Sequence, residues 1–304
     1  MKIRVAIVGY GNIGKYALQA LESAPDMECA GIVRSSAGRC TPEYLKSTPE
    51  LSRYKVVTDV AELGQVDVVI LSTPSRSVEE NAKKYLSMGI NTVDSFDIHS
   101  GICDLRHSLN PVACKGGAVS IISAGWDPGT DSVVRALLEG MAPSGTTYTN
   151  FGPGRSMGHS VAAASKEGVV KALSMTIPVG MGKHRREVFV ELEKGADFAA
   201  VEKAVKSDPY FINDDTVVKQ VPSVAAIDTH MHGVKLERGG VSGSTEGQRL
   251  EFNMRINNPA LTGQVLVMAA RATMRQSPGC YTMIEVPVVD FLAGNREENI
   301  KKLV

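Results

Sequence analysis

The first 120 residues alternate short apolar runs with segments of helical periodicity. The apolar runs cover residues 5–8, 29–33, 55–57, 66–71, 92–93 and 118–122. Runs without polar alternation are typical of parallel strands that are buried on both faces. The helical patterns lie between them, over 15–23, 78–88 and 105–113. This order predicts an α/β fold with a Rossmann-type, doubly wound parallel sheet.

The pattern changes after residue 125. Apolar side chains alternate with mostly polar ones over 187–192 and 250–256, which is typical of antiparallel strands with one covered face. The helices expected in this part are 131–141 and, with an amphipathic pattern, 261–275, and the last extended segment is 281–291. A second domain with a mostly antiparallel sheet is therefore predicted.

Composition excludes several classes of protein. Lys+Arg and Asp+Glu both number 33, so no global basic surface is available for nucleic acid. No apolar run is long enough to span a bilayer, and the first one is too short for a signal peptide. The cysteines, none in a C-x-x-C pair, are Cys29, Cys40, Cys103, Cys114 and Cys280. These cysteines predict reduced thiols in a cytoplasmic protein. The charge balance and the short apolar runs predict that it has no nucleic-acid or membrane partner.

Three glycines follow the first strand in the order G-x-G-x-x-G. Gly9 permits a tight turn, Gly11 lets the backbone approach phosphates, and Gly14 allows close packing of helix and strand. The residues between them are Tyr10, Asn12 and Ile13. A helix N-terminus then points its free N–H groups at an anion, which predicts a dinucleotide site rather than a purely structural turn.

The end of the second strand indicates which dinucleotide binds. An NAD site usually has Asp or Glu there for the ribose 2′-hydroxyl, whereas this chain has Arg34, Ser35 and Ser36. A guanidinium and two hydroxyls can bind a 2′-phosphate, so NADP is favoured. The alternative is that Arg34 is only a solvated loop cation.

Polar clusters follow three further predicted strands, at the sheet edge where ligands of such folds bind. The positions expected to contact the cofactor there are Ser72, Thr73, Pro74, Ser75, Ser95, Phe96, Asp97, Ala124, Gly125, Trp126, Asp127 and Pro128. The Ser/Thr cluster could also cap a helix. Asp97 and Asp127 could converge to bind an ammonium group and accept a proton as an amine becomes an imine. The alternatives are that Asp127 makes an Asp-Pro turn and Asp97 caps a helix.

The second domain contributes Thr176, Arg186, His232 and Asn258 as candidate binding residues. Arg186 lies in a basic run that could simply be exposed, and Asn258 before a proline could cap a helix. His230 and His232 lack a third ligand at metal spacing, so no metal is predicted. We expect a dinucleotide-binding domain over 1–123, to which about 277–304 returns. An α+β domain for substrate binding and dimerisation should occupy 124–276.

Taken together, these segments resemble the meso-diaminopimelate dehydrogenase family along essentially the whole chain. The stretches that carry the resemblance are 4–12, 92–99, 123–129, 150–160 and 256–259. The G-W-D-P-G and F-G-P-G stretches are far more specific than the glycine loop. The resemblance implies NADP-dependent, reversible oxidative deamination of the D-centre of meso-2,6-diaminopimelate to L-2-amino-6-oxopimelate and ammonia.

The resemblance also implies roles for individual residues. The reacting D-centre would lie against Asp97, Trp126 and Asp127, with the base left open between the two aspartates. The walls of the pocket would be Phe151, Met157 and Gly158, and the distal L-centre would be held by Thr176, Arg186, His232 and Asn258. Holding the L-centre remotely would present only the D-centre to the cofactor.

The chain lacks an insertion between Pro178 and Arg186 that some members of the family carry. Compact members can have a wider substrate range, which implies reductive amination of 2-oxo acids to D-amino acids. We expect a homodimer through the sheet of the second domain, with a hexamer as the alternative. Rival functions are another two-domain NADP reductase of amino-acid biosynthesis and a non-catalytic NADP-binding sensor.

Overall fold

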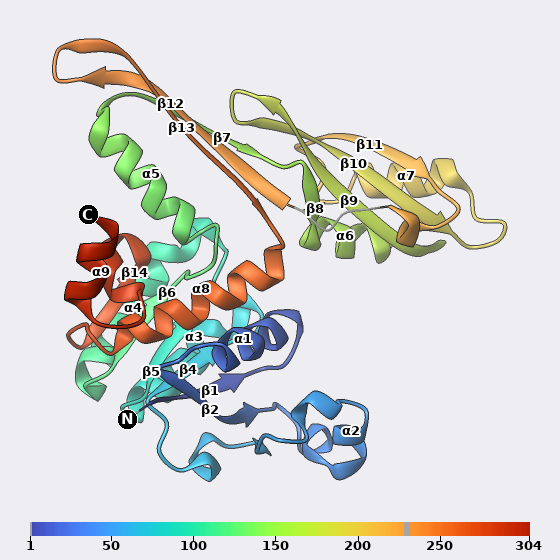
Figure 1. Cartoon of the computed structure of the whole chain (residues 1–304). Helices are drawn as coiled ribbons and strands as arrows, with labels where there is room; N and C mark the ends of the chain where they lie inside the picture. The colour runs from blue at the N-terminus through green and yellow to red at the C-terminus, as the bar shows by residue number, and fades with distance from the viewer. Residues whose placement is uncertain (1, 228–231) are drawn as a thin grey trace. The chain divides into compact units, whose positions relative to one another are not determined.

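The computed structural model describes residues 2–227 and 232–304, except for the side chain of Met157. The chain divides into two compact units, shown with their labelled elements in Figure 1. Unit 1 comprises residues 1–134 and 259–304, and unit 2 comprises residues 135–258. None of the helices in these described ranges is long and apolar enough to cross a membrane.

Unit 1 contains a seven-stranded parallel sheet in the order β14-β6-β5-β4-β1-β2-β3. The strands are β1 Ile3–Val8, β2 Met27–Val33, β3 Val56–Val57, β4 Val68–Leu71, β5 Asn91–Asp94, β6 Val119–Ile122 and β14 Gly279–Thr282. The helices are α1 Asn12–Glu22, α2 Pro42–Lys46, α3 Val78–Ser87, α4 Ile102–Gly116, α8 Asn258–Thr273 and α9 Arg296–Leu303. The predicted doubly wound parallel sheet is confirmed.

Alternate residues of β1 enter two separate cores because successive side chains of a strand point to opposite faces. Val5 and Ile7 join the core that contains side chains of α1 and α8. Ala6 and Val8 join the core that contains side chains of α3 and α4. Burial on both faces explains why β4 is apolar throughout and why β1 is apolar from Val5 to Val8.

Helix α8 differs from the amphipathic helix expected over 261–275. Its buried residues occur all round the helix, and Val265, Leu266 and Val267 all belong to one core of unit 1. A Cβ at Gly263 would lie 2.6 Å from the backbone nitrogen of Ala17, so only glycine permits this approach to α1. The helix therefore belongs to unit 1, and the division between units differs from the expected bounds 1–123 and 124–276.

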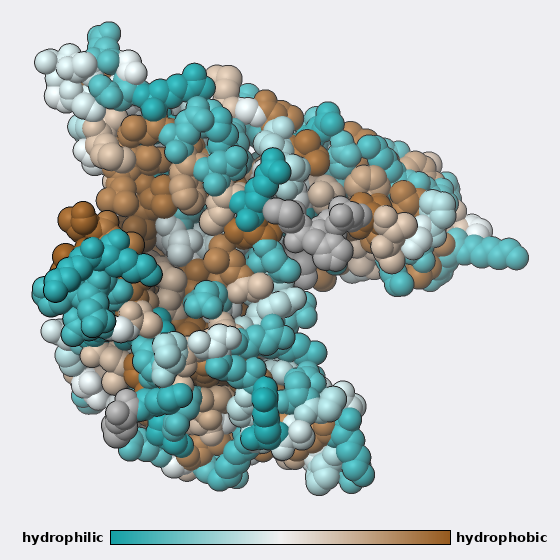
Figure 2. Space-filling view, in the orientation of Figure 1, coloured by the Kyte–Doolittle hydropathy of each residue, from teal (hydrophilic) through white to brown (hydrophobic). Residues whose placement is uncertain are grey.

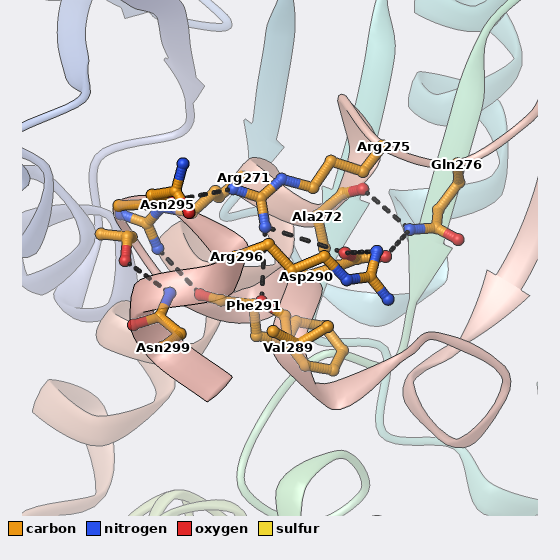
Figure 3. A network of polar contacts seen from close by, with 12 residues as sticks. Arg271, Ala272, Arg275, Gln276, Val289, Asp290, Phe291, Asn295, Arg296 and Asn299 are labelled. Atoms are coloured by element: carbon orange, nitrogen blue, oxygen red, sulfur yellow. Dashed lines mark hydrogen bonds and ion pairs between the residues drawn. The ribbon is translucent and has the colours of Figure 1, made fainter. Parts of the chain in front are cut away.

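The C-terminal segment completes unit 1, because β14 pairs in parallel with β6. The extended segment expected over 281–291 is wrong beyond Thr282, where two 3-10 turns follow, Met283–Glu285 and Val288–Phe291. Asp290, 4% exposed, accepts a hydrogen bond from Gln276 at 3.0 Å. Figure 3 shows Arg275 and Arg296 beside the same carboxylate, and these ion pairs fix the segment after α8.

Unit 2 contains two sheets and two helices of its own. The four-stranded sheet has the order β11-β10-β9-β8, and the three-stranded antiparallel sheet has the order β13-β12-β7. The strands are β7 Ser144–Phe151, β8 Gly154–Ser156, β9 Val169–Gly180, β10 Lys183–Leu192, β11 Asp215–Gln220, β12 His232–Ser242 and β13 Thr245–Ile256. The helices are α6 Met157–Ala164 and α7 Phe198–Lys206, and α5 Thr130–Met141 begins in unit 1.

The predicted antiparallel character of unit 2 is confirmed except at β10 and β11, which pair in parallel. Side chains of α6 and α7 share one core with Val188 and Val190 of β10, so both helices cover the same face of the four-stranded sheet. The tip of the β12–β13 hairpin is hydrophilic in Figure 2. The alternation of apolar and polar residues in β10 thus reflects the one face that α6 and α7 cover.

Candidate active site

The glycine loop between β1 and α1 leaves open space at one position only. A Cβ at Gly9, whose φ is +91°, would lie 2.5 Å from the carbonyl oxygen of Ser72. A Cβ at Gly14 would lie 2.6 Å from the carbonyl oxygen of Gly9, whereas one at Gly11 would meet nothing within 4 Å. Gly11 is the N-cap of α1 and makes no side-chain capping bond. The loop therefore has the shape that admits a phosphate beside free backbone N–H groups.

The remaining positions of this loop frame the same opening. Tyr10 is buried, and Asn12 and Ile13 form the first turn of α1. Arg34, at the end of β2, is 5% exposed and lies between two aromatic rings, 5.9 Å from the centroid of Tyr10 and 5.7 Å from that of Tyr44. The alternative that Arg34 is only a solvated loop cation is therefore wrong.

Arg34 has unused hydrogen-bonding capacity. Nη2 donates to the Tyr44 hydroxyl at 3.4 Å, which is long for a hydrogen bond, and Nη1 is buried without a partner among the described residues. Ser35 and Ser36 follow it and are exposed. A buried guanidinium that lacks a carboxylate partner fits an anionic ligand group.

The end of β4 adds two more unsatisfied groups. The hydroxyls of Ser72 and Thr73 are buried and have no hydrogen-bond partner within the described ranges. Beyond Pro74, the hydroxyl of Ser75 donates to Oδ1 of Asp97 at 2.6 Å, which places Asp97 beside this strand end. Free donors beside a glycine loop fit the ribose and phosphates of a dinucleotide.

The loop after β6 is tightly closed. The N–H of Gly125 donates to the carbonyl of Pro128 at 3.0 Å, and a Cβ at Gly125 would lie 3.7 Å from the Cβ of Ser95. Trp126 is 7% exposed, and Asp127 is half-buried. The structure thus brings the loop of Ser95 and Phe96 next to the loop from Ala124 to Pro128, while convergence of Asp97 and Asp127 stays a prediction.

A second cluster lies in unit 2, where Thr176 on β9 and Arg186 on β10 face each other in register. Both are buried, and Nη1 of Arg186 donates to the Thr176 hydroxyl. Nε of Arg186 donates to Asp214 Oδ2 at 2.6 Å. The reading of Arg186 as part of an exposed basic run is therefore wrong, because the side chain is 11% exposed and held at two positions.

Asp214 was not identified from the sequence, and two histidines flank it. Nε2 of His159 lies 3.6 Å from one carboxylate oxygen, and Nε2 of His184 lies 3.5 Å from the other. Burial, followed by the charge of Arg186, lowers the pKa of both imidazoles. This shift favours the neutral form of both histidines, and the ion pair of Arg186 with Asp214 lies at the centre of the cluster.

The turn after β7 lies against the same strand. A Cβ at Gly152, which follows Phe151, would lie 2.2 Å from the carbonyl oxygen of Thr176. The N–H of Gly152 donates to the carbonyl of Gly233 at 2.8 Å, which brings His232 to this turn. His232 lines a cavity of about 400 Å³ in unit 2. The backbone thus brings the turn after Phe151 next to Thr176 and Gly233, whereas Phe151, Thr176 and Arg186 do not line the cavity that His232 lines.

The other predicted binding positions lie at helix starts. Met157 begins α6, and Gly158 is exposed, with a Cβ position 3.3 Å from the ring of Tyr210. Asn258 is the first residue of α8. His230, considered above with His232, lies outside the described residues. In the part of the chain that is described, no group of three His, Cys, Asp or Glu side chains could hold a metal.

Two family models match the chain. The diaminopimelic acid dehydrogenase C-terminal domain matches residues 125–182, and the semialdehyde dehydrogenase NAD binding domain matches residues 4–97. The Meso-diaminopimelate D-dehydrogenase of Bacteroides fragilis is 62% identical over 303 residues, covering 100% of this chain and 99% of that protein.

Solved structures of similar proteins extend the comparison. The C. glutamicum DAP dehydrogenase in complex with DAP is 29% identical with a TM-score of 0.84, covering 100% of this chain and 99% of that one. An engineered D-amino acid dehydrogenase bound to NADP+ is 28% identical with a TM-score of 0.80, covering 100% of both chains. The nucleotide-binding match over residues 4–97 coincides with the cradle formed by Gly11, Arg34 and Ser72.

Proposed function

Because the chain belongs to the meso-diaminopimelate D-dehydrogenase family, we propose that it deaminates the D-centre of meso-2,6-diaminopimelate with NADP as oxidant. The products are L-2-amino-6-oxopimelate and ammonia, and the reverse reaction is a reductive amination. The observation that carries this proposal is the 62% identity to a curated family member over the whole chain. The family resemblance read from the sequence motifs is thereby confirmed.

The preference for NADP is supported by Arg34. Its buried Nη1 without a partner and the exposed hydroxyls of Ser35 and Ser36 suit a 2′-phosphate. The glycine loop, Ser72 and Thr73 would bind the pyrophosphate and ribose. A nicotinamide held there would supply the oxidising power, as the acceptor of the hydride from the D-carbon.

The side chains at the reacting end would be Asp97, Trp126 and Asp127. Two carboxylates can bind the ammonium group of the D-centre, and either of them can accept its proton as the imine forms. Water then attacks the imine carbon, and ammonia leaves. Trp126 is buried in its loop and would form an apolar wall that excludes other water from the reacting carbon.

The distal L-centre would be bound in unit 2. Arg186 has two of its nitrogens engaged by Thr176 and Asp214, and its other N–H groups would bind the distal carboxylate. His232 and Asn258 would complete this subsite. The walls would be Phe151, Met157 and Gly158. Anchoring the far end of the substrate orients the D-centre, which is catalysis by positioning.

The test is an assay of cofactor reduction with meso-, LL- and DD-diaminopimelate, each with NADP and with NAD. Reduction with the meso isomer and NADP alone is the expected result. Tight NADP binding without reduction by any isomer would refute the proposal and favour a non-catalytic sensor. Reduction of the cofactor by other amino acids alone, or oxidation of NADPH by 2-oxo acids alone, would favour another reductase.

A further inference from the structure

Asp94, the last residue of β5, is a fully buried carboxylate that no role proposed above uses. Its Oδ1 accepts two backbone hydrogen bonds, from the N–H of Phe96 at 2.9 Å and from the N–H of Ser123 at 3.0 Å. Its carbonyl oxygen accepts a third, from the N–H of Ala124 at 2.7 Å. One residue therefore holds the beginning of two loops that follow neighbouring strands.

These two loops carry the side chains assigned to the reacting end. Asp97 comes directly after Phe96, and Trp126 and Asp127 come shortly after Ser123. Ser123 has a φ of +54°, a left-handed conformation that non-glycine residues rarely adopt, so its geometry depends on the bonds that hold it. A shift of Asp94 would therefore move both loops relative to each other.

The environment of Asp94 is unusual for a group that only closes a turn. Oδ2 has no hydrogen-bond partner among the described residues, and burial raises the pKa of the carboxyl to about 6. The ionisable group that faces it from β14 is Cys280, whose thiol is neutral because burial raises its pKa to about 12. Arg106 and Glu285 form an ion pair with each other, and their charges also affect the pKa of Cys280, which Arg106 lowers and Glu285 raises. Burial without a counter-charge is costly for a carboxylate, whereas a neutral amide could close a turn more cheaply.

We propose that Asp94 is a positioning residue, which fixes the loop of Asp97 against the loop of Trp126 and Asp127 through one carboxylate oxygen. This inference rests on the proposed function for its effect on the reaction. Its structural part does not, because Trp126 is the single tryptophan of the chain and reports on its loop by fluorescence.

The experiment compares Asp94→Ala and Asp94→Asn with Thr92→Val. Thr92 is the matched control, because it is buried on the same strand and its hydroxyl donates to Ser120 at 2.9 Å without touching either loop. Asp94→Ala should lower kcat for diaminopimelate on the order of tenfold or more. Asp94→Asn should restore most of kcat, since its amide oxygen can accept both N–H groups.

Trp126 fluorescence provides the second readout. Asp94→Ala should shift its emission to the red, while Thr92→Val should leave it unchanged. Asp94→Asn should keep the emission of the wild-type protein, because its amide oxygen can accept the same two N–H groups. The asparagine variant also keeps the test valid if the alanine variant does not fold.

Three outcomes would overturn the inference. The first is wild-type kcat and emission in a folded Asp94→Ala variant. The second is an equal loss of kcat in Thr92→Val, because the effect would then be general destabilisation. The third is a red-shifted emission in a folded Asp94→Asn variant, because accepting the two N–H groups would then not be what holds the loops. If the wild-type protein does not oxidise diaminopimelate, the proposed function fails, but the fluorescence comparison still tests the role of Asp94.

Discussion

Replacing Arg34 by alanine should weaken NADP binding far more than NAD binding. Arg34 is 5% exposed, and the one hydrogen bond that its guanidinium makes to a described residue, the hydroxyl of Tyr44, is long at 3.4 Å. Arg34 therefore loses little hydrogen bonding to the protein when its guanidinium binds a phosphate. A hydrogen bond to a charged group contributes about 1.5–3 kcal/mol, so the NADP affinity should fall roughly 10- to 150-fold. NAD has no 2′-phosphate, and its affinity should change little.

The assay is a titration of each variant with NADPH and NADH, followed by the fluorescence of the bound cofactor. Arg34→Lys should fall between the wild type and Arg34→Ala, because an ammonium keeps the charge but lacks the planar fork. Tyr44→Phe is the matched control. It removes the weak contact of the guanidinium with the Tyr44 hydroxyl while keeping the neighbouring ring, so NADPH should bind nearly as to the wild type.

An equal loss of affinity for both cofactors would refute the reasoning. It would mean that Arg34 acts by holding the rings of Tyr10 and Tyr44 in place rather than by binding a phosphate. Thermal unfolding of the cofactor-free variants checks this directly, since a purely structural role would lower the melting temperature of Arg34→Ala together with both affinities.

Four further predictions concern the distal site, the core, pH and substrate range. Arg186→Met should raise KM for diaminopimelate while the Kd for NADP stays constant, and an unchanged KM would contradict its assignment to the L-centre. Arg271→Met should lower the free energy of unfolding by about 2 kcal/mol in denaturant titrations, because Arg271 is buried and donates at 2.6 and 2.8 Å to both oxygens of the partly exposed Asp26. The pKa of His184 is lowered in the folded protein, so the unfolded chain protonates this imidazole more readily. His184 therefore contributes stability above its usual pKa, and this stability is lost as the pH falls. His184→Gln should make the free energy of unfolding less dependent on pH between pH 7 and about 5. Pyruvate and phenylpyruvate with NADPH and ammonia should give the D-amino acids, measured by chiral chromatography, and the absence of any D-product would remove the broader activity.

The parallel sheet was predictable because burial on both faces leaves a local signature, an uninterrupted apolar run, in its central strands β1 and β4. Helix α8 was misread for a related reason. Its sequence mixes Ala, Gly and Thr with large apolar residues, and small residues at a buried position resemble a weakly polar face. The contact that needs Gly263 is made with the backbone of α1, and no periodicity within α8 indicates that partner. The same long-range packing decides to which unit the helix belongs.

The cofactor cradle is formed largely within one stretch of chain, whereas Asp94 and Asp214 act on distant residues. The glycine loop is a single turn that contains Gly9, Gly11 and Gly14, so the spacing of these glycines alone predicts the nucleotide-binding turn. Asp94 and Asp214 each act on a group almost thirty positions away in sequence, the N–H of Ser123 and the guanidinium of Arg186. The one local sign is a carboxylate at the end of an apolar strand without a basic neighbour, as at Asp94. A buried charge needs a partner that only the fold brings to it, so such residues are found by asking which N–H groups the neighbouring strand ends leave unpaired.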